Sequence, residues 1–210
     1  AQAKVTEAKL NLAYTRVAKL AGAKAVLAPL DAKDGFRLHI ESIEERIGPR
    51  TRAVMICTPS NPLGTVIDRP TIAELSRLCD ERGLYLISDE VYRDLYYTPE
   101  PPPSPLGLCQ NAIVIRALSK SHAMTGWRLG WTLAPREVTQ RLILVHAYAI
   151  TCVASVVQNT ALRLFRSGKM DDLSAEARAL YRHRKELVLE QLQRHGLHCI
   201  PPEGAFYAFP

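Results

Sequence analysis

The stretch AVMICTPSNPLGTVIDRPTIAELSRLCDERGLYLIS, residues 53–88, holds two apolar runs with an amphipathic segment between them. Both runs are continuous rather than alternating in hydrophobicity, which is typical of strands covered on both faces in a parallel sheet. Between them, Pro70, a Thr71-x-x-Glu74 capping box and a stop at Gly83 predict a helix. A strand, a helix and a strand in this order predict a right-handed crossover in an α/β sheet.

The same reading extends along the rest of the chain. A long helical region is expected from Pro135 through Phe165, followed by a break at 167–170 and a second helix over about 172–195. The tail CIPPEGAFYAFP, residues 199–210, has strand character around a turn. Four apolar runs are expected to form strands, at residues 25–30, 53–58, 84–88 and 112–118.

The change in pattern after the sheet predicts two domains. We place the boundary near Gly168, so that residues 1–167 form a large sheet domain and residues 168–210 begin a smaller one. The proline-rich segment 98–107 is too short for an interdomain linker and is expected to be a loop of the first domain.

Composition narrows the class of protein. Hydrophobic residues make up 47% and charged residues 23% of the 210 residues, as in an ordinary globular protein, and no apolar run is long enough to cross a membrane. Five scattered cysteines without a CxxC pattern argue against a disulfide framework or zinc site and for a cytoplasmic setting.

The net charge of +6 is spread along the chain without a nucleic-acid-binding motif. We expect no metal, no nucleic acid and no membrane partner. The N-terminal residues 1–11 lack a secretory signal.

Polar residues gather where the expected strands end. Ligands of open α/β sheets bind beyond the carboxyl ends of the strands. Each of these residues also has an interpretation without function. Asn61 can be an ordinary turn residue, Asp89 and Glu90 can be solvated at the end of a strand, Lys120 can be solvated, and Arg128 can stack on a tryptophan. Because all of them are expected at the same edge of the predicted sheet, a ligand-binding site is favoured. In chain order, the candidate residues are Asn61, Asp89, Tyr92, Ser119, Lys120 and Arg128.

Four motifs give the chain a resemblance to the class I/II aminotransferases of the pyridoxal-phosphate (PLP) fold type I. They are TPSNPLG, SDEVY, ALSKSHAMTGWRLGW and PPEGAFYAFP. The lysine motif is highly specific, and the similarity runs from about Tyr14 to Pro210. The resemblance implies a three-layer α/β/α large domain with a mostly parallel sheet, followed by the start of a smaller α+β domain. It also implies a homodimer that moves an amino group between an amino acid and a 2-oxo acid.

The resemblance also implies a role for each candidate. Lys120 would form the Schiff base with PLP and later carry a proton. Asp89 would keep the pyridine nitrogen protonated, while Asn61 and Tyr92 would bond the ring's 3'-oxygen. The phosphate would be held by Ser119 and Arg128.

The chain departs from the family at two positions. Ala117 stands where many relatives have a second phosphate-binding serine, and His122 stands where they often have an aromatic residue. His122 is open to two interpretations, a second base or a packed or surface histidine, and the second is favoured.

Several segments that the resemblance implies have no counterpart. A Gly-rich phosphate loop, a ring-stacking aromatic residue and a subunit-spanning arm find no match upstream of Tyr14, and an arginine for the substrate carboxylate finds none downstream. We therefore expect an internal portion of an aminotransferase that is inactive by itself. A carbon–sulfur lyase of the same fold and an effector-sensing domain of a transcription regulator are the alternatives.

Overall fold

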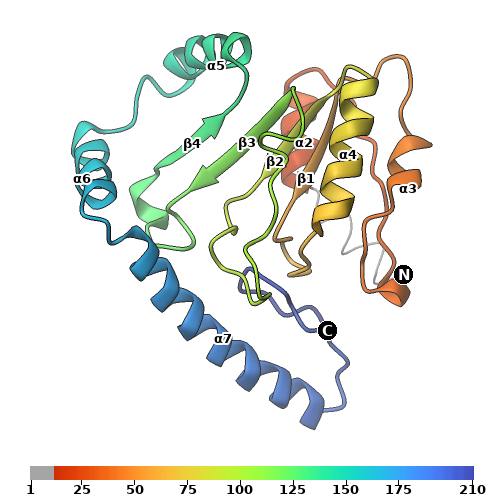
Figure 1. Ribbon diagram of the computed structural model, residues 1–210, viewed down its shortest axis with the longest axis vertical. Coiled ribbons are helices and arrows are strands. Elements are labelled where there is room, and N and C mark those ends of the chain that lie inside the picture. Colours follow the sequence, from red (N-terminus) through yellow and green to blue (C-terminus); the bar gives the residue numbers. More distant parts are fainter. Residues whose placement is uncertain (1–11) are drawn as a thin grey trace. The chain divides into compact units, whose positions relative to one another are not determined.

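A computed structural model describes residues 12–210 (Figure 1). The chain forms two compact units, one that ends at Thr51 and one that runs from Arg52 to Pro210. The expectation for residues 1–11 lies outside the described residues. Within the described residues, no helix has both the length and the apolar character needed to span a membrane.

The first unit contains helices and irregular chain. Within its described residues 12–51, the elements are α2 (Leu12–Leu20), the short 3-10 helix η1 (Ala32–Asp34) and α3 (Ile40–Glu44). The prediction of a strand at 25–30 is wrong, because these residues have no regular structure. The Leu27 carbonyl accepts a hydrogen bond from Arg46 Nε at 3.1 Å, so a side chain takes the place of a neighbouring strand.

The second unit is built on a four-stranded sheet in the order β1-β2-β3-β4. The first three strands are parallel, and β4 pairs antiparallel with β3. The predicted α/β fold with a mostly parallel sheet is therefore confirmed. β4 was not predicted, because four residues beginning at a glycine carry little strand signal. The bounds are β1 Ala53–Cys57, β2 Tyr85–Asp89, β3 Ala112–Ala117 and β4 Gly130–Leu133.

Helix α4 (Arg69–Glu81) connects β1 to β2 and covers one face of the sheet (Figure 1). Its N-cap is Asp68, whose carboxylate accepts from the Thr71 backbone N–H at 2.8 Å. The cap thus lies three residues before the one proposed from the sequence, since Pro70 already has helical geometry. The apolar stripe packs as predicted: Ile72, Leu75, Leu78 and Cys79 are buried.

The opposite face of the sheet is more open than the continuous apolar runs suggested. Met55 in β1 and Tyr85 in β2 are 41% and 39% exposed, whereas Leu86 and Val114 are fully buried. Coverage on both faces is therefore not found at these positions.

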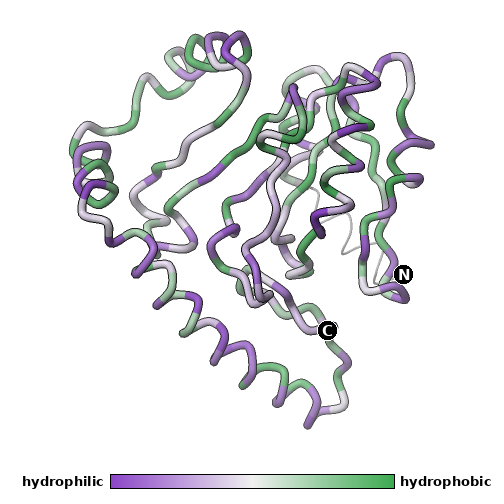
Figure 2. The backbone as a smooth tube through the Cα atoms, in the orientation of Figure 1, coloured by the Kyte–Doolittle hydropathy of each residue, from purple (hydrophilic) through white to green (hydrophobic). Residues whose placement is uncertain are grey.

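Three helices follow β4. The expected helical region is divided into α5 (Arg136–Ala149) and α6 (Ser155–Arg166), because the helix ends at Ala149 and Thr151 takes a positive φ of 71°. α7 (Met170–Arg194) matches the second expected helix, and its polar and apolar residues alternate along the backbone in Figure 2. The tail contributes one bridge, between Gly204 and Tyr96, rather than a strand.

Candidate functional site

The register of the parallel strands sets the edge on which the candidate residues lie. Cys57 lies opposite Asp89, and Asp89 lies opposite Ile115. The backbone continues the pairing past the strand ends, since Thr58 N–H donates to the Asp89 carbonyl at 3.1 Å. The loops after β1, β2 and β3 therefore leave the sheet at one edge.

The loop after β1 presents Asn61. Two cis peptide bonds precede Pro59 and Pro62, on either side of it, and the Gly64 N–H closes the loop on the Ser60 carbonyl at 2.9 Å. Although Asn61 is exposed, its Nδ2 donates to Tyr92 Oη at 3.3 Å. The structure thus brings together two residues that lie 31 positions apart in the sequence.

Tyr92 is the centre of this group. It is buried, and its Oη lies 2.7 Å from Tyr207 Oη. Burial, followed by the hydrogen bond with Tyr207, raises the pKa of Tyr92 above its usual value. The Tyr92 phenol therefore keeps its proton at neutral pH and can act as a hydrogen-bond donor.

Lys120 lies in the turn directly after β3, and its side chain reaches the same group. Its Nζ is 5.7 Å from the centroid of the Tyr92 ring and 5.9 Å from that of Phe206. The two rings pack edge to face at 5.4 Å. An amine against two ring faces is confined by cation–π attraction to one side of the turn.

Asp89 is the last residue of β2, Glu90 follows it, and the two carboxylates have different partners. Asp89 is half-buried, and its Oδ1 accepts from the Val91 backbone N–H at 3.2 Å. The Glu90 side chain is fully buried, and its Oε2 is 2.8 Å from Arg116 Nη2. The interpretation of Glu90 as a solvated residue at the strand end is therefore wrong, because its carboxylate is buried and paired with Arg116.

Ser119 and Arg128 lie at the two ends of the loop that follows β3. Thr125 links them: its hydroxyl donates to the Ser119 carbonyl at 2.7 Å, and its own carbonyl accepts from Arg128 Nη1 at 3.1 Å. Arg128 is exposed and, among the described residues, makes no hydrogen bond with Asn61, Tyr92 or Lys120.

The same loop holds its backbone in an unusual conformation. Arg128 and Ala123 have positive φ values of 55° and 53°, which few residues other than glycine adopt. Such backbone strain gathers at functional sites, where the surrounding structure imposes it.

Phe206 and Tyr207 reach the site from the far end of the chain. The segment 203–207 is held by backbone bonds from the Gly204 N–H to the Gly64 carbonyl at 2.9 Å and from the Ala205 N–H to the Leu95 carbonyl at 2.8 Å. No individual role was predicted for these two aromatic residues. The available signal was their place directly after the turn in PPEGAFYAFP.

His122 is a packed residue rather than a free base. Its Nδ1 lies 2.8 Å from Ser121 Oγ, and its Nε2 lies 3.2 Å from the Met170 carbonyl. Both ring nitrogens are therefore occupied by protein partners, which fits the favoured of the two interpretations.

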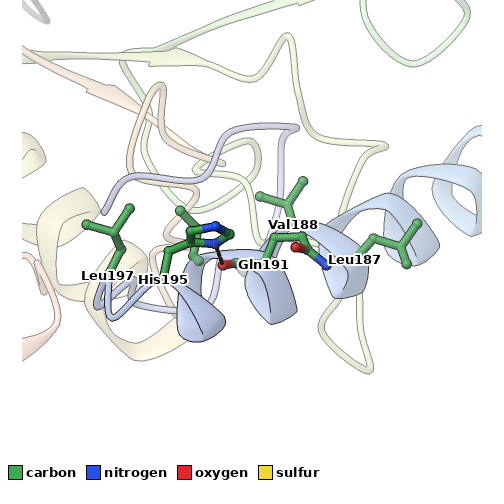
Figure 3. A pocket seen from close by; sticks show the side chains of 6 residues that line it. Leu187, Val188, Gln191, His195 and Leu197 are labelled. Carbon is green, nitrogen blue, oxygen red and sulfur yellow. Dashed lines mark hydrogen bonds between the residues drawn. The ribbon is translucent and has the colours of Figure 1, made fainter.

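A shallow apolar depression at the end of α7 lies apart from these residues. Figure 3 shows its wall, including His195, whose Nδ1 lies 2.8 Å from the Gln191 carbonyl. It contains none of the candidate residues, so we do not assign it to the site. Its lining is Leu187, Val188, Gln191, Leu192, His195 and Leu197. No group of three or more metal-ligating side chains occurs within residues 12–210.

Comparison with known proteins identifies the family of the chain. The family model for aminotransferase class I and II matches residues 12–210. A probable N-acetyl-LL-diaminopimelate aminotransferase of Bacillus subtilis is 35% identical over 197 residues, which is 94% of this chain and 49% of the relative. An aromatic-amino-acid aminotransferase of Thermococcus litoralis is 34% identical over 202 residues, 95% of this chain and 52% of the relative.

A solved structure shows the same fold. The aspartate aminotransferase from Thermus thermophilus with maleate superposes with a TM-score of 0.89 at 32% identity, over 93% of this chain and 51% of that one. The chain thus spans about half the length of the curated relatives that it matches. Since the family model covers nearly all of its residues, the chain belongs to the class I and II aminotransferase family.

Proposed function

We propose that the full-length protein is a PLP-dependent aminotransferase that transfers an amino group between an amino acid and a 2-oxo acid, with Lys120 as the lysine that binds the cofactor. One observation carries the proposal. The Lys120 amine lies over the ring of Tyr92, which is hydrogen-bonded to Asn61, at the edge of the sheet where Asp89 ends β2. Relatives named as aspartate and aromatic-amino-acid aminotransferases support the reaction class.

The donors present fit the chemical groups of PLP. The PLP aldehyde reacts with a primary amine, which Lys120 supplies. The pyridinium nitrogen pairs with a carboxylate, which Asp89 supplies, and the phenolate oxygen accepts a hydrogen bond from a neutral donor, which Tyr92 supplies. Burial is the main cause of the raised pKa of Tyr92, so the hydroxyl group stays protonated and can donate a hydrogen bond at neutral pH. Ser119 and Arg128 would hold the phosphate, for which a guanidinium offers two parallel donors.

When bound, PLP supplies an electron-withdrawing ring that stabilises negative charge at the substrate's α-carbon. The chain's residues do the remaining work. Asp89 holds the proton on the ring nitrogen, and the Lys120 Nζ carries a proton to and from the α-carbon. Tyr92 and Asn61 would orient the ring, Tyr92 from a buried position and Asn61 from an exposed one.

Three further features of the full-length protein belong to the same proposal. We expect a cytoplasmic enzyme, since all five cysteines are free thiols. We expect a homodimer, as family resemblance implies. The domain boundary near Gly168 is also proposed, because Gly168 takes a φ of 71° where α6 gives way to α7.

Trapping the lysine tests the assignment. Full-length protein is incubated with PLP and reduced with borohydride, and the pyridoxyl mass is sought by peptide mass spectrometry. We expect it on Lys120 and expect Lys120→Ala to lose it, whereas the control Lys169→Ala should keep it. Label on another lysine with Lys120 unmodified would overturn the proposal.

Turnover separates the reaction classes. Amino-group transfer requires a 2-oxo acid acceptor, whereas a carbon–sulfur lyase releases pyruvate from cystathionine without one. Turnover that depends on the 2-oxo acid supports the transferase, and acceptor-independent pyruvate release would replace it by the lyase.

A further inference from the structure

The residues that follow Lys120 form a connected polar chain. Ser121 is almost completely buried, and its Oγ lies 2.8 Å from His122 Nδ1 and 3.4 Å from Asp94 Oδ2. On its other side, His122 Nε2 lies 3.2 Å from the carbonyl of Met170, the first residue of α7. The turn that carries Lys120 is therefore tied to two other elements, the loop after β2 and the start of α7.

Helix α7 is also in contact with the aromatic rings of the site. Tyr181 stacks on Phe206 with ring centroids 5.3 Å apart, and the Lys120 Nζ lies 5.9 Å from the same Phe206 ring. Arg178 adds a hydrogen bond from its Nη1 to the Asp94 carbonyl at 3.2 Å. A displacement of α7 would thus disturb both the turn of Lys120 and a ring beside its amine.

The hydrogen bonds fix the protons of His122. A carbonyl only accepts, so Nε2 must carry a hydrogen in the contact with Met170. In the neutral ring, Nδ1 is then an acceptor, and the single Ser121 proton is donated to it, which leaves Asp94 without that donor. In the protonated ring, Nδ1 donates to Ser121 Oγ, and the hydroxyl is free to rotate and donate to Asp94.

We infer that His122 is a positioning residue for Lys120, which fastens the lysine's turn to the first residue of α7 and switches the partner of the Ser121 hydroxyl when the ring is protonated. The inference rests on the proposed role of Lys120. The charged groups next to these contacts along the chain are Lys120 on the turn itself, Arg93 and Asp94 after β2, and Lys169, Asp171 and Asp172 around Met170. Arg178 of α7 also bonds the Asp94 carbonyl.

Three variants of the full-length protein separate anchoring from titration. His122→Phe keeps a ring but removes both contacts. His122→Gln keeps an N–H donor for Met170 but cannot titrate, and Ser121→Ala removes the middle link alone. His183→Gln, on an exposed position of α7, is the matched control.

The first measurements need no cofactor. Nitrogen-15 NMR of the wild-type ring at pH 8.5 should find the hydrogen on Nε2. Hydrogen exchange in the first two turns of α7 should be about two- to tenfold faster in His122→Phe, the factor that one net hydrogen bond supplies. His122→Gln should restore wild-type exchange. A hydrogen on Nδ1, or exchange in His122→Phe equal to that of His183→Gln, would overturn the inference.

The pH profile of kcat gives the second measurement. Wild type and His183→Gln should show a pH-dependent step in kcat that arises when the Ser121 hydroxyl changes its partner between His122 and Asp94. That step should be absent from His122→Gln and His122→Phe and reduced in Ser121→Ala, and its persistence in both His122 variants would refute the switch. If borohydride labelling of wild type fails at Lys120, the proposed function fails instead, while the NMR and exchange results still decide the role of His122.

Discussion

Asp89 and Glu90 are adjacent carboxylates with opposite surroundings. Asp89 is half-buried at the end of β2, whereas Glu90 is fully buried among basic and hydroxyl groups. Successive side chains of a strand point to opposite faces, so one position separates a candidate catalytic group from a structural one.

The substitution Asp89→Asn tests the first carboxylate. In the full-length protein we expect turnover to fall by about 10²- to 10³-fold, the scale on which the loss of one electrostatic partner in an active site is felt. The far-ultraviolet circular dichroism and the unfolding midpoint should stay close to those of wild type. Activity within a factor of about three of wild type would remove Asp89 from the site.

Glu90→Gln should damage stability instead. Glu90 Oε2 is 2.9 Å from Arg116 Nε, and its Oε1 is 2.5 Å from Ser104 Oγ. Removing one partner of a buried ion pair costs about 3 kcal/mol or more of the free energy of unfolding. Urea denaturation measures this, with the exposed Glu81→Gln as a control that should change it by less than about 1 kcal/mol. Equal midpoints for the two variants would contradict the buried pair.

At the scale of elements, the segment 203–207 depends on close backbone approach. A Cβ at Gly204 would lie 2.6 Å from Pro59 Cγ and 3.0 Å from the Leu95 carbonyl, so only glycine fits. The approach places Phe206 and Tyr207 beside Tyr92. The segment 203–207 is therefore packed against the candidate residue Tyr92.

Gly204→Ala is expected to release this segment. The added methyl group should lower the free energy of unfolding by about 1–3 kcal/mol, as overpacking does. The loss of the contact between Tyr92 and Tyr207 should also change the fluorescence of these two tyrosines. Gly48→Ala is the control, since nothing lies within 4 Å of its new Cβ. Identical urea curves for the two variants would argue against the close approach.

Two buried thiols give the second unit a pH dependence. Cys79 ends the apolar stripe of α4, and Cys109 lies just before β3 with its Sγ 3.3 Å from Asp80 Oδ1. Burial raises the pKa of Cys79 to about 11 and, together with the bond to Asp80, that of Cys109 to about 12. The folded protein thus holds these protons above pH 9, where the unfolded chain releases them.

The sign of the effect follows from this difference. The contribution to stability is complete below pH 9 and is lost as the pH rises through 11 and 12, at about 1.4 kcal/mol for each unit of pKa difference. Urea unfolding at pH 8 and pH 10.5 should show the decline, and Cys109→Ala should flatten it. Cys152→Ala, at an exposed position, should leave the slope unchanged, and a slope that Cys109→Ala also leaves unchanged would refute the assignment.

At the scale of the whole molecule, α5 exposes apolar side chains around its circumference. Four consecutive residues, Leu142–Val145, are each at least 40% exposed. These four residues make one turn of α5 apolar on all sides, and such a surface is normally buried. The chain spans about half the length of its relatives, so we expect other parts of the full-length protein to cover α5.

The behaviour of residues 1–210 alone tests this expectation. The isolated chain should bind a hydrophobic dye and self-associate in light scattering, and the double variant Ile143→Ser/Val145→Ser should reduce both. Leu106→Ser, a single exposed leucine in a loop, is the control. The isolated chain should also bind PLP weakly and fail to transaminate. A monodisperse monomer with stoichiometric PLP and turnover would contradict both expectations.

The sequence by itself determined the parts of this protein that depend on local signals. β1, β2, β3, α4 and α7 follow from apolar runs, helix periodicity and end signals, and the candidates Asn61, Asp89, Tyr92 and Lys120 follow from the rule that strand ends hold ligands. These patterns are complete within about 25 residues, so no distant partner is needed to read them.

Only the tertiary structure decided the rest. The apolar run at 25–30 has no strand partner, while the weakly marked residues 130–133 form β4 because β3 offers a free edge. The burial of Glu90 depends on Arg116, 26 positions away, and the contact of Tyr92 with Tyr207 spans 115 positions. Such contacts form only when the fold brings distant segments together, so they cannot be predicted from the residues next to each side chain in the sequence.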